Sequence, residues 1–173
     1  MDRLALSLHS RCCAWALLER GMNEPTDSVV ERAERACSES GLRLTPKRRN
    51  VLLTLLQADG PLTAYELAAQ YQSIFGEPIP MMSVYRMLDI LVQVELAHKL
   101  DTTTQYVACA HIACDHQHEV PQFLICDQCH SVAEIGVSKA LVEQIRKSVE
   151  RTGFRLKRQQ LELHGACASC RKR

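Results

Sequence analysis

The sequence lacks the features of a membrane-spanning, low-complexity or uniformly basic protein. Its apolar runs, such as Val51-Leu52-Leu53 and Ile90-Leu91-Val92, are far too short to cross a bilayer. It has no internal repeats, and its net charge of only +1 excludes a uniformly polybasic chain. With 173 residues, of which 46% are hydrophobic and 24% charged, it can bury a core as one ordinary domain or two small ones.

A recognisable export signal is also missing. Residues 1–21 are mildly apolar, but Asp2, His9 and Arg11 interrupt the stretch and no small-residue cleavage site follows. We therefore expect a cytoplasmic protein with reduced thiols. Residues 1–28 are expected to be an N-terminal extension; either translation starts at Met22, or residues 1–21 form a short amphipathic helix.

Helix signals followed by a hairpin signal fill the next part of the chain. Thr45-Pro46 and the capping box Thr63-Ala64-Tyr65-Glu66 mark helix starts. The expected helices cover residues 29–39, Thr45-Pro46 to Asp59-Gly60, Thr63 to about Phe75, and roughly Met82 to Val94; the expected strands are Ala97–Leu100 and Gln105–Cys109. This pattern predicts a winged helix-turn-helix domain over residues 29–109.

The remaining residues predict a histidine- and cysteine-rich hinge at 110–122 and a small α/β domain at 123–173, so that the whole chain is α+β. The expected elements are strands Phe123–Cys126 and Ser131–Ile135, a helix over about 138–151 with an apolar face of Leu141, Val142, Ile145 and Val149, and strand Phe154–His164. A unit of roughly 50 residues needs a partner or a cross-link beyond its own core.

Cysteine usage suggests that cross-link. The nine cysteines are an odd set, and four of them form the pairs Cys126-Asp127-Gln128-Cys129 and Cys167-Ala168-Ser169-Cys170. Four thiolates from two such pairs build a closed tetrahedral zinc site with a structural role. A redox pair or incidental core cysteines are the alternatives.

A second metal site is indicated by the composition around the hinge. Between Leu100 and Ser138 the chain has five acidic residues and no lysine or arginine. The same window contains His111, His116, His118, His130, Cys109 and Cys114. These residues suit a metal site of mixed S, N and O ligands that binds its ion more weakly than the four-thiolate site does. Any single histidine here can equally be a solvated loop residue.

Basic residues gather at two predicted helix starts. The stretch Arg43-Leu44-Thr45-Pro46-Lys47-Arg48-Arg49 carries four positive charges where helix amides favour phosphate. Ser83, Tyr85 and Arg86 lie in the first turns of the fourth helix, where a recognition helix meets base edges. The alternative is a solvated charged face.

Jointly, these motifs resemble those of the ferric uptake regulator family of metal-dependent repressors, most closely its zinc uptake regulators. Arg43-Leu-Thr-Pro-Lys-Arg, Thr63-Ala-Tyr-Glu-Leu, Ser83-Val-Tyr-Arg-Met-Leu-Asp and Phe123-Leu-Ile-Cys-Asp-Gln-Cys occur in the family's order, and the ending His164-Gly-Ala-Cys-Ala-Ser-Cys fits too. The likeness covers about residues 29–170. It implies an N-terminal winged-helix DNA reader and a C-terminal dimerisation domain.

The resemblance also implies site residues. It assigns the structural zinc to Cys126, Cys129, Cys167 and Cys170, a regulatory zinc to His98, Cys109, a hinge histidine and Glu134, and DNA contacts to Tyr85, Arg86, Arg43 and Lys47. The interval from Cys109 to Cys126 is slightly longer than the family's pattern. We therefore choose His118 as the hinge histidine, with His116 second and His111 third. The soft thiolate of Cys109 favours zinc over iron.

The expected protein is a homodimer with two zinc ions per subunit, which binds an operator in double-stranded DNA and represses zinc-uptake genes. The nearest alternative is a regulator of the same family that responds to iron, manganese, nickel or peroxide. A zinc hydrolase using Glu134, or a zinc-stabilised interaction module, are rivals of other classes. No glycine loop or positioned nucleophile supports an enzyme, and we expect neither a small-molecule substrate nor a membrane association.

Overall fold

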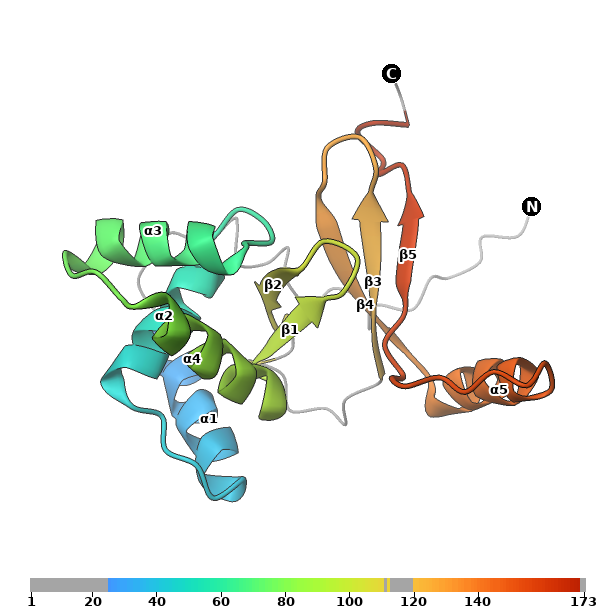
Figure 1. Ribbon diagram of the computed structural model, residues 1–173, viewed down its shortest axis with the longest axis horizontal. Helices are drawn as coiled ribbons and strands as arrows, with labels where there is room; N and C mark the ends of the chain where they lie inside the picture. Colours follow the sequence, from blue (N-terminus) through green and yellow to red (C-terminus); the bar gives the residue numbers. More distant parts are fainter. Residues whose placement is uncertain (1–24, 111, 113–119, 172–173) are drawn as a thin grey trace, which may run out of the picture.

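The computed structural model describes residues 25–110, 112 and 120–171, which form two lobes (Figure 1). The N-terminal lobe contains α1 (Pro25–Glu39), α2 (Pro46–Gln57), α3 (Ala64–Phe75), α4 (Met81–Gln93) and the hairpin β1 (Ala97–Leu100) and β2 (Gln105–Ala108). The C-terminal lobe contains β3 (Val120–Cys126), β4 (Val132–Val137), α5 (Lys139–Glu150) and β5 (Glu162–Gly165). The α+β class and the order of elements expected from the sequence are confirmed.

Local sequence signals set the ends of the helices. The Thr45 hydroxyl accepts a hydrogen bond from Arg48 N at 3.4 Å, and Pro46 opens α2. The predicted capping box is present, because Thr63 N donates to the Glu66 carboxylate at 2.8 Å while Glu66 N donates to the Thr63 hydroxyl. Gly76 ends α3 with a φ of 74°, a conformation that glycine adopts without strain.

The N-terminal lobe has a continuous core formed by all four helices and the hairpin. Its fully buried side chains include Cys37, Val51, Leu52, Leu67, Val84, Leu88 and Leu91. The apolar faces of α1, α2 and α4 therefore point inward. The hairpin, which we call the wing, packs on this core through Ala97 and Tyr106.

The sheet of the C-terminal lobe has the strand order β4-β3-β5. β4 pairs antiparallel with β3, whereas β5 runs parallel to it. The long last strand predicted over Phe154–His164 is wrong, since only Glu162–Gly165 is a strand. Just before β5, Gln122 Nε2 donates to Gln159 O at 3.1 Å and Gln122 Oε1 accepts from Leu161 N at 2.7 Å, so a side chain takes the place of ladder partners at residues 159 and 161.

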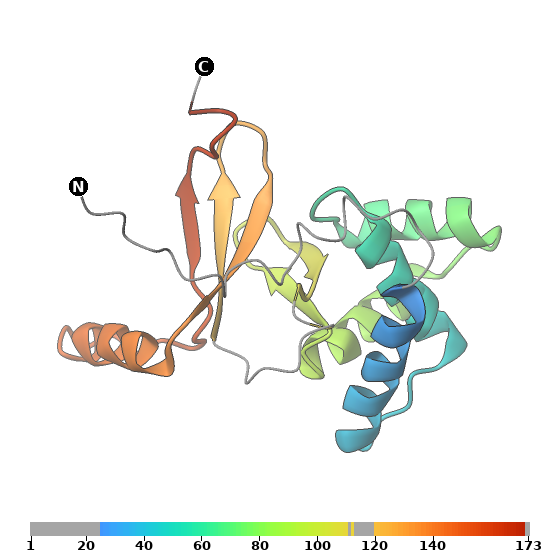
Figure 2. The same ribbon diagram turned by 180° about the vertical axis from the view of Figure 1, so that it is seen from behind.

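The C-terminal lobe buries much less than the N-terminal lobe. Among its described residues, the buried ones are Gln122, Phe123, Ile125, Cys126 and Val142. The predicted apolar face of α5 exists, but of its four residues only Val142 is buried. From both sides of the molecule, α5 projects away from the sheet (Figures 1 and 2). Among the described residues, no helix combines the length and the apolar character needed to cross a membrane.

Candidate metal centres and nucleic-acid interface

Four cysteines meet at the free end of the sheet. Cys126 ends β3, Cys129 follows in the turn to β4, and Cys167 and Cys170 follow β5. Their sulfur atoms all lie within 4.8 Å of one another, and the Sγ atoms of Cys129 and Cys167 are 3.7 Å apart. Zinc–sulfur bonds of about 2.3 Å in a tetrahedron place the sulfurs about 3.8 Å apart. The donor set and its spacing therefore fit a closed tetrahedral thiolate site.

Backbone amides prepare this group for a cation. Cys167 N donates to the Cys126 sulfur at 3.3 Å, and backbone hydrogen bonds, this one foremost, lower the pKa of the Cys126 thiol to about 6. The pKa of Cys167 is also lowered, first by a backbone hydrogen bond at Cys170. The pKa of Cys170 is raised to about 12, because its thiol donates to the neighbouring thiolates. The group therefore accumulates negative charge that a divalent cation neutralises.

A second group joins the two lobes at the hinge. His98 is in β1 and Cys109 follows β2, whereas Glu134 is in β4 of the other lobe. The ligand atoms of these three residues lie within 4.8 Å of one another, and His98 Nε2 is 3.8 Å from Glu134 Oε1. One nitrogen, one sulfur and one carboxylate oxygen form a mixed donor set that suits zinc.

The hinge group is held by the elements around it. Only 9% of His98 is exposed, and its ring centroid lies 5.2 Å from that of Phe123 in β3. Ala110 N donates to Glu134 Oε2 at 2.9 Å, and Cys109 N donates to Leu96 O at 3.0 Å. The three side chains are thus positioned by strand register and backbone contacts rather than by long flexible loops.

The remaining predicted hinge residues lie outside the described part of the chain. These are His118, His116, His111 and Cys114. The choice among the three histidines as the further ligand therefore stays a prediction. His130 is described, but it is not among the residues of either group.

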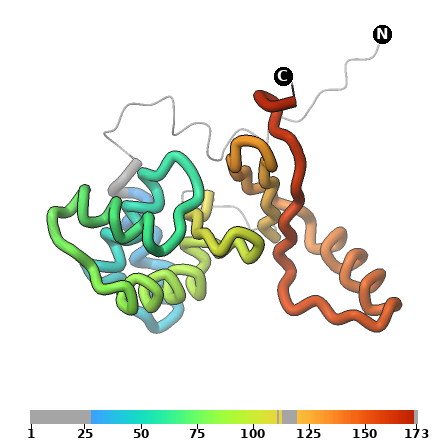
Figure 3. The backbone as a smooth tube through the Cα atoms, turned by 45° about the horizontal axis from the view of Figure 1, so that its top comes forward, coloured from blue at the N-terminus to red at the C-terminus, as the bar shows by residue number. Residues whose placement is uncertain are grey.

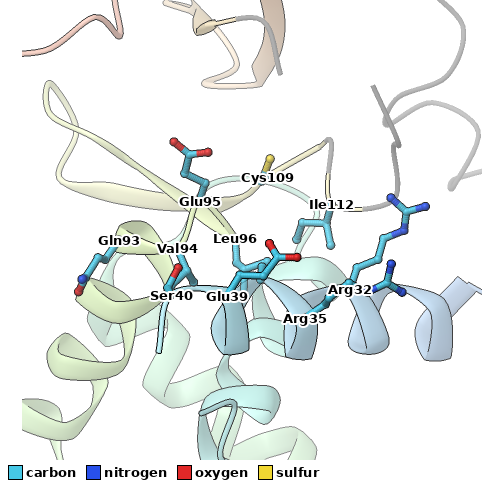
Figure 4. Close-up of a pocket in the computed structure, with 11 residues that line it drawn as sticks. Arg32, Arg35, Glu39, Ser40, Gln93, Val94, Glu95, Leu96, Cys109 and Ile112 are labelled. Atoms are coloured by element: carbon cyan, nitrogen blue, oxygen red, sulfur yellow. The ribbon is translucent and has the colours of Figure 1, made fainter. Parts of the chain in front are cut away.

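A cavity of about 390 Å³ lies beside the hinge group, between α1 and the turn from α4 to β1 (Figure 4). Cys109 is at its rim, and Arg32, Arg35 and Glu39 of α1 line one side. Glu95 lies on the other side. Because its charges have both signs, the cavity favours no single class of ligand.

The predicted DNA-contacting residues reach solvent at two helix starts. Arg43, Lys47 and Arg86 are exposed, Tyr85 is 36% exposed and Ser83 is half-buried. Neither α2 nor α4 has an acidic residue in its first turn, so the positive ends of both helix dipoles are open to phosphate. Arg48 differs from its neighbours because its guanidinium donates to Arg43 O and so supports the turn before α2.

Two exposed apolar residues near helix starts were missed by the sequence analysis. Tyr65, in the first turn of α3, is 68% exposed, and Met82, in the first turn of α4, is 65% exposed. An exposed aromatic ring beside a capping box is a usable sequence signal, since the cap fixes Tyr65 on the outer side of the helix start. Both side chains are available for contact with bases or sugars.

Comparison with known proteins identifies the class. The sequence profile of the ferric uptake regulator family matches residues 39–164, and the chain belongs to that family. The zinc uptake regulation protein of Escherichia coli strain K12 is 32% identical over 145 residues, covering 84% of this chain and 82% of that protein. The resemblance expected from the sequence motifs is therefore confirmed.

Similar solved structures agree with this family assignment. The crystal structure of holo XcZur is 41% identical, with a TM-score of 0.69, and covers 86% of this chain and 100% of that one. A zinc uptake regulator complexed with zinc and DNA is 29% identical, with a TM-score of 0.72, and covers 87% of this chain and 97% of that one.

Proposed function

We propose that this protein is a zinc-responsive, DNA-binding transcriptional repressor of zinc-uptake genes, active in the cytoplasm as a metal-loaded homodimer. The similarity to zinc uptake regulators, one of them solved with zinc and DNA, supports this function. Membership of a family of regulators argues against the hydrolase alternative.

The hinge group is the observation that carries the proposal. His98 and Cys109 belong to the wing end of the N-terminal lobe, and Glu134 belongs to the sheet of the other lobe. When bound, zinc supplies one coordination centre for all three side chains. The sensing residues are therefore also the residues that set the angle between the lobes.

We assign two zinc ions to each subunit. The structural ion belongs to Cys126, Cys129, Cys167 and Cys170, whose spacing fits a closed thiolate site. The regulatory ion belongs to His98, Cys109, Glu134 and His118, and the thiolate of Cys109 favours zinc over iron. Loading requires deprotonated ligands and weakens as pH falls.

A homodimer accounts for the apolar surface of the C-terminal lobe. Leu141, Ile145 and Val149 line a groove along α5. On the sheet, Leu124, Ile135 and Leu163 are 40%, 37% and 49% exposed and lie on one face. An apolar surface of this extent indicates a binding partner, and a second copy of this chain supplies an identical apolar surface to pack against it.

In the dimer, two copies of α4 face two half-sites of the operator. Arg86 offers a bidentate contact to guanine, while Tyr85, Ser83, Arg43 and Lys47 contact phosphates or a thymine methyl group. The distance between the two α4 helices depends on the angle between lobes in each subunit. Fixing that angle at the hinge raises the population that matches the half-site spacing.

The test is metal-dependent selection of DNA. Purified protein is depleted of its removable metal, reloaded with zinc, iron(II) or manganese(II), and used to select sequences from random 30-base-pair duplexes. We expect zinc alone to enrich a two-fold symmetric sequence. Cys109→Ser should abolish this enrichment, whereas Cys37→Ala, which removes a thiol from the helical core, should not. Enrichment by iron or manganese in place of zinc would overturn the zinc assignment and leave the family intact.

A further inference from the structure

The wing touches the C-terminal lobe at a second place, separate from the hinge group. The turn 101–104 between β1 and β2 lies against β5, as Figure 3 shows. Asp101 N and Thr102 N donate to the Glu162 carboxylate at 2.6 and 2.9 Å, and the Thr102 hydroxyl donates to the same carboxylate. A single side chain of β5 therefore binds three donors of the wing turn. We call this set of bonds the wing–β5 contact.

Neighbours of Glu162 strengthen the contact. Arg158 Nη1 lies 3.0 Å from the Asp101 carboxylate, and Gln160 Nε2 donates to Lys99 O at 2.9 Å. Burial raises the pKa of Glu162, but the hydrogen bonds from Thr102 and Asp101 outweigh this effect, so the pKa lies below its ordinary value. The carboxylate is thus charged at neutral pH, and hydrogen bonds to a charged acceptor are the stronger kind.

The register of the sheet connects this contact with the hinge group. Phe123 of β3 pairs with Glu134 of β4 on one side and with Glu162 of β5 on the other. The three side chains form one row across the sheet, on the face that meets the wing. Adjacent strands are about 4.8 Å apart, so Glu134 and Glu162 meet the wing at points separated by about two strand spacings.

The wing turn itself is strained. Thr104 has a φ of 54°, a conformation that a β-branched residue rarely adopts. Such a turn keeps one shape only where surrounding contacts determine it. Here the contacts at the other end of the turn come from the other lobe, through Glu162.

We propose that Glu162 is a positioning residue that fixes the wing on the C-terminal lobe. The hinge metal and the wing–β5 contact then jointly set the angle between the lobes at which the protein binds DNA. One attachment point leaves the wing free to pivot, whereas two points along one row of the sheet define its direction. The hinge metal and the wing–β5 contact strengthen each other, because each favours the same arrangement of the lobes. This proposal rests on the proposed function and adds a regulatory determinant outside both metal groups.

The test uses the full-length, zinc-loaded protein and its Glu162→Gln variant. Three quantities are measured: amide hydrogen exchange at Asp101 and Thr102, the zinc concentration that half-fills the removable site, and affinity for a selected duplex. We expect fast exchange at both amides, a several-fold higher zinc midpoint, and about tenfold weaker DNA binding. Glu34→Gln, the same charge change at an exposed site of α1, is the control and should leave all three unchanged.

Each outcome is decisive. A Glu162→Gln variant with wild-type zinc midpoint and DNA affinity would overturn the proposal. Should that variant fail to fold, Thr102→Ala, in the exposed turn, decides instead and should weaken DNA binding less but in the same direction. If the zinc-loaded wild type binds no selected duplex, the proposed function fails, and amide exchange with the zinc midpoint still tests whether Glu162 positions the wing.

Discussion

Removal of the four-thiolate metal should unfold the C-terminal lobe and spare the N-terminal one. The change is Cys170→Ser, or extraction of the metal by a high-affinity chelator. The buried large apolar side chains described in residues 120–171 are Phe123, Ile125 and Val142, which contribute about 1.5–3 kcal/mol each. Structural zinc contributes about 10–16 kcal/mol in small zinc-dependent peptides. We therefore expect the metal to contribute more to the stability of this lobe than its buried side chains do.

Geometry decides which part unfolds first. β5 is four residues long, pairs with β3 alone among the described strands, and is followed directly by the segment carrying Cys167 and Cys170. Without those ligands, the parallel pairing must hold the segment by itself. We therefore expect β5 to separate before β3 and β4 do, and the wing–β5 contact to be lost with it.

Hydrogen exchange measured by mass spectrometry distinguishes the two lobes. Peptides from residues 120–171 should lose protection on chelation, while peptides from 46–100 should keep theirs. Cys37→Ala is the matched control, because it removes a buried thiol from the N-terminal core and should leave metal content unchanged. Equal protection of the C-terminal peptides before and after metal removal would refute the reasoning.

Three further predictions concern DNA binding and the local backbone. Arg86→Ala should weaken binding to a selected duplex by about 1–3 kcal/mol in a titration, whereas the exposed Arg155→Ala should change little; equal losses would contradict a base-reading role. Thr104→Gly should raise the free energy of unfolding in urea by about 1 kcal/mol by relieving the positive φ, and a lower urea midpoint would count against it. The hydrogen bond from the Thr63 backbone N–H lowers the pKa of Glu66 in the folded protein. The cap therefore stabilises α3 fully above about pH 4.3, the ordinary pKa of a glutamate, and this stabilisation is lost as the pH falls through the lowered pKa. Glu66→Gln should therefore lower the thermal midpoint at pH 7, and this drop should shrink as the pH falls through the depressed pKa; a drop that does not change with pH would refute this cause.

Local signals made much of the fold predictable. Helix starts at Thr45 and Thr63 depend on neighbours within three residues, and both were located from the sequence. β1 was predicted with its exact bounds, because a polar turn separates it from β2. At residues 159 and 161, where a strand was wrongly predicted, the backbone bonds a distant partner, the Gln122 side chain, which no pattern within that segment reveals.

The residues of the candidate sites also fall into those that local sequence patterns predict and those that they do not. The spacing of the two Cys-x-x-Cys pairs by itself predicts a four-thiolate group, and the structure brings their sulfur atoms together. Selection of His98 and Glu134 among many histidines and acids needed the family resemblance. Their distance of 3.8 Å follows from the placement of the wing on the sheet. The choice of a hinge histidine as a further ligand concerns residues outside the described part of the chain and stays a prediction.

The sequence by itself determined the helices, the wing hairpin, the thiolate pairs and the basic helix starts, because each depends on residues close together in the chain. Tertiary structure alone decided that Glu134, Phe123 and Glu162 form one row facing the wing, since that row requires three strands in register. It also decided that α5 and the outer face of the sheet remain uncovered within one chain. Long-range pairing thus places the surfaces proposed for sensing, positioning and dimerisation, whereas local chemistry supplies their residues.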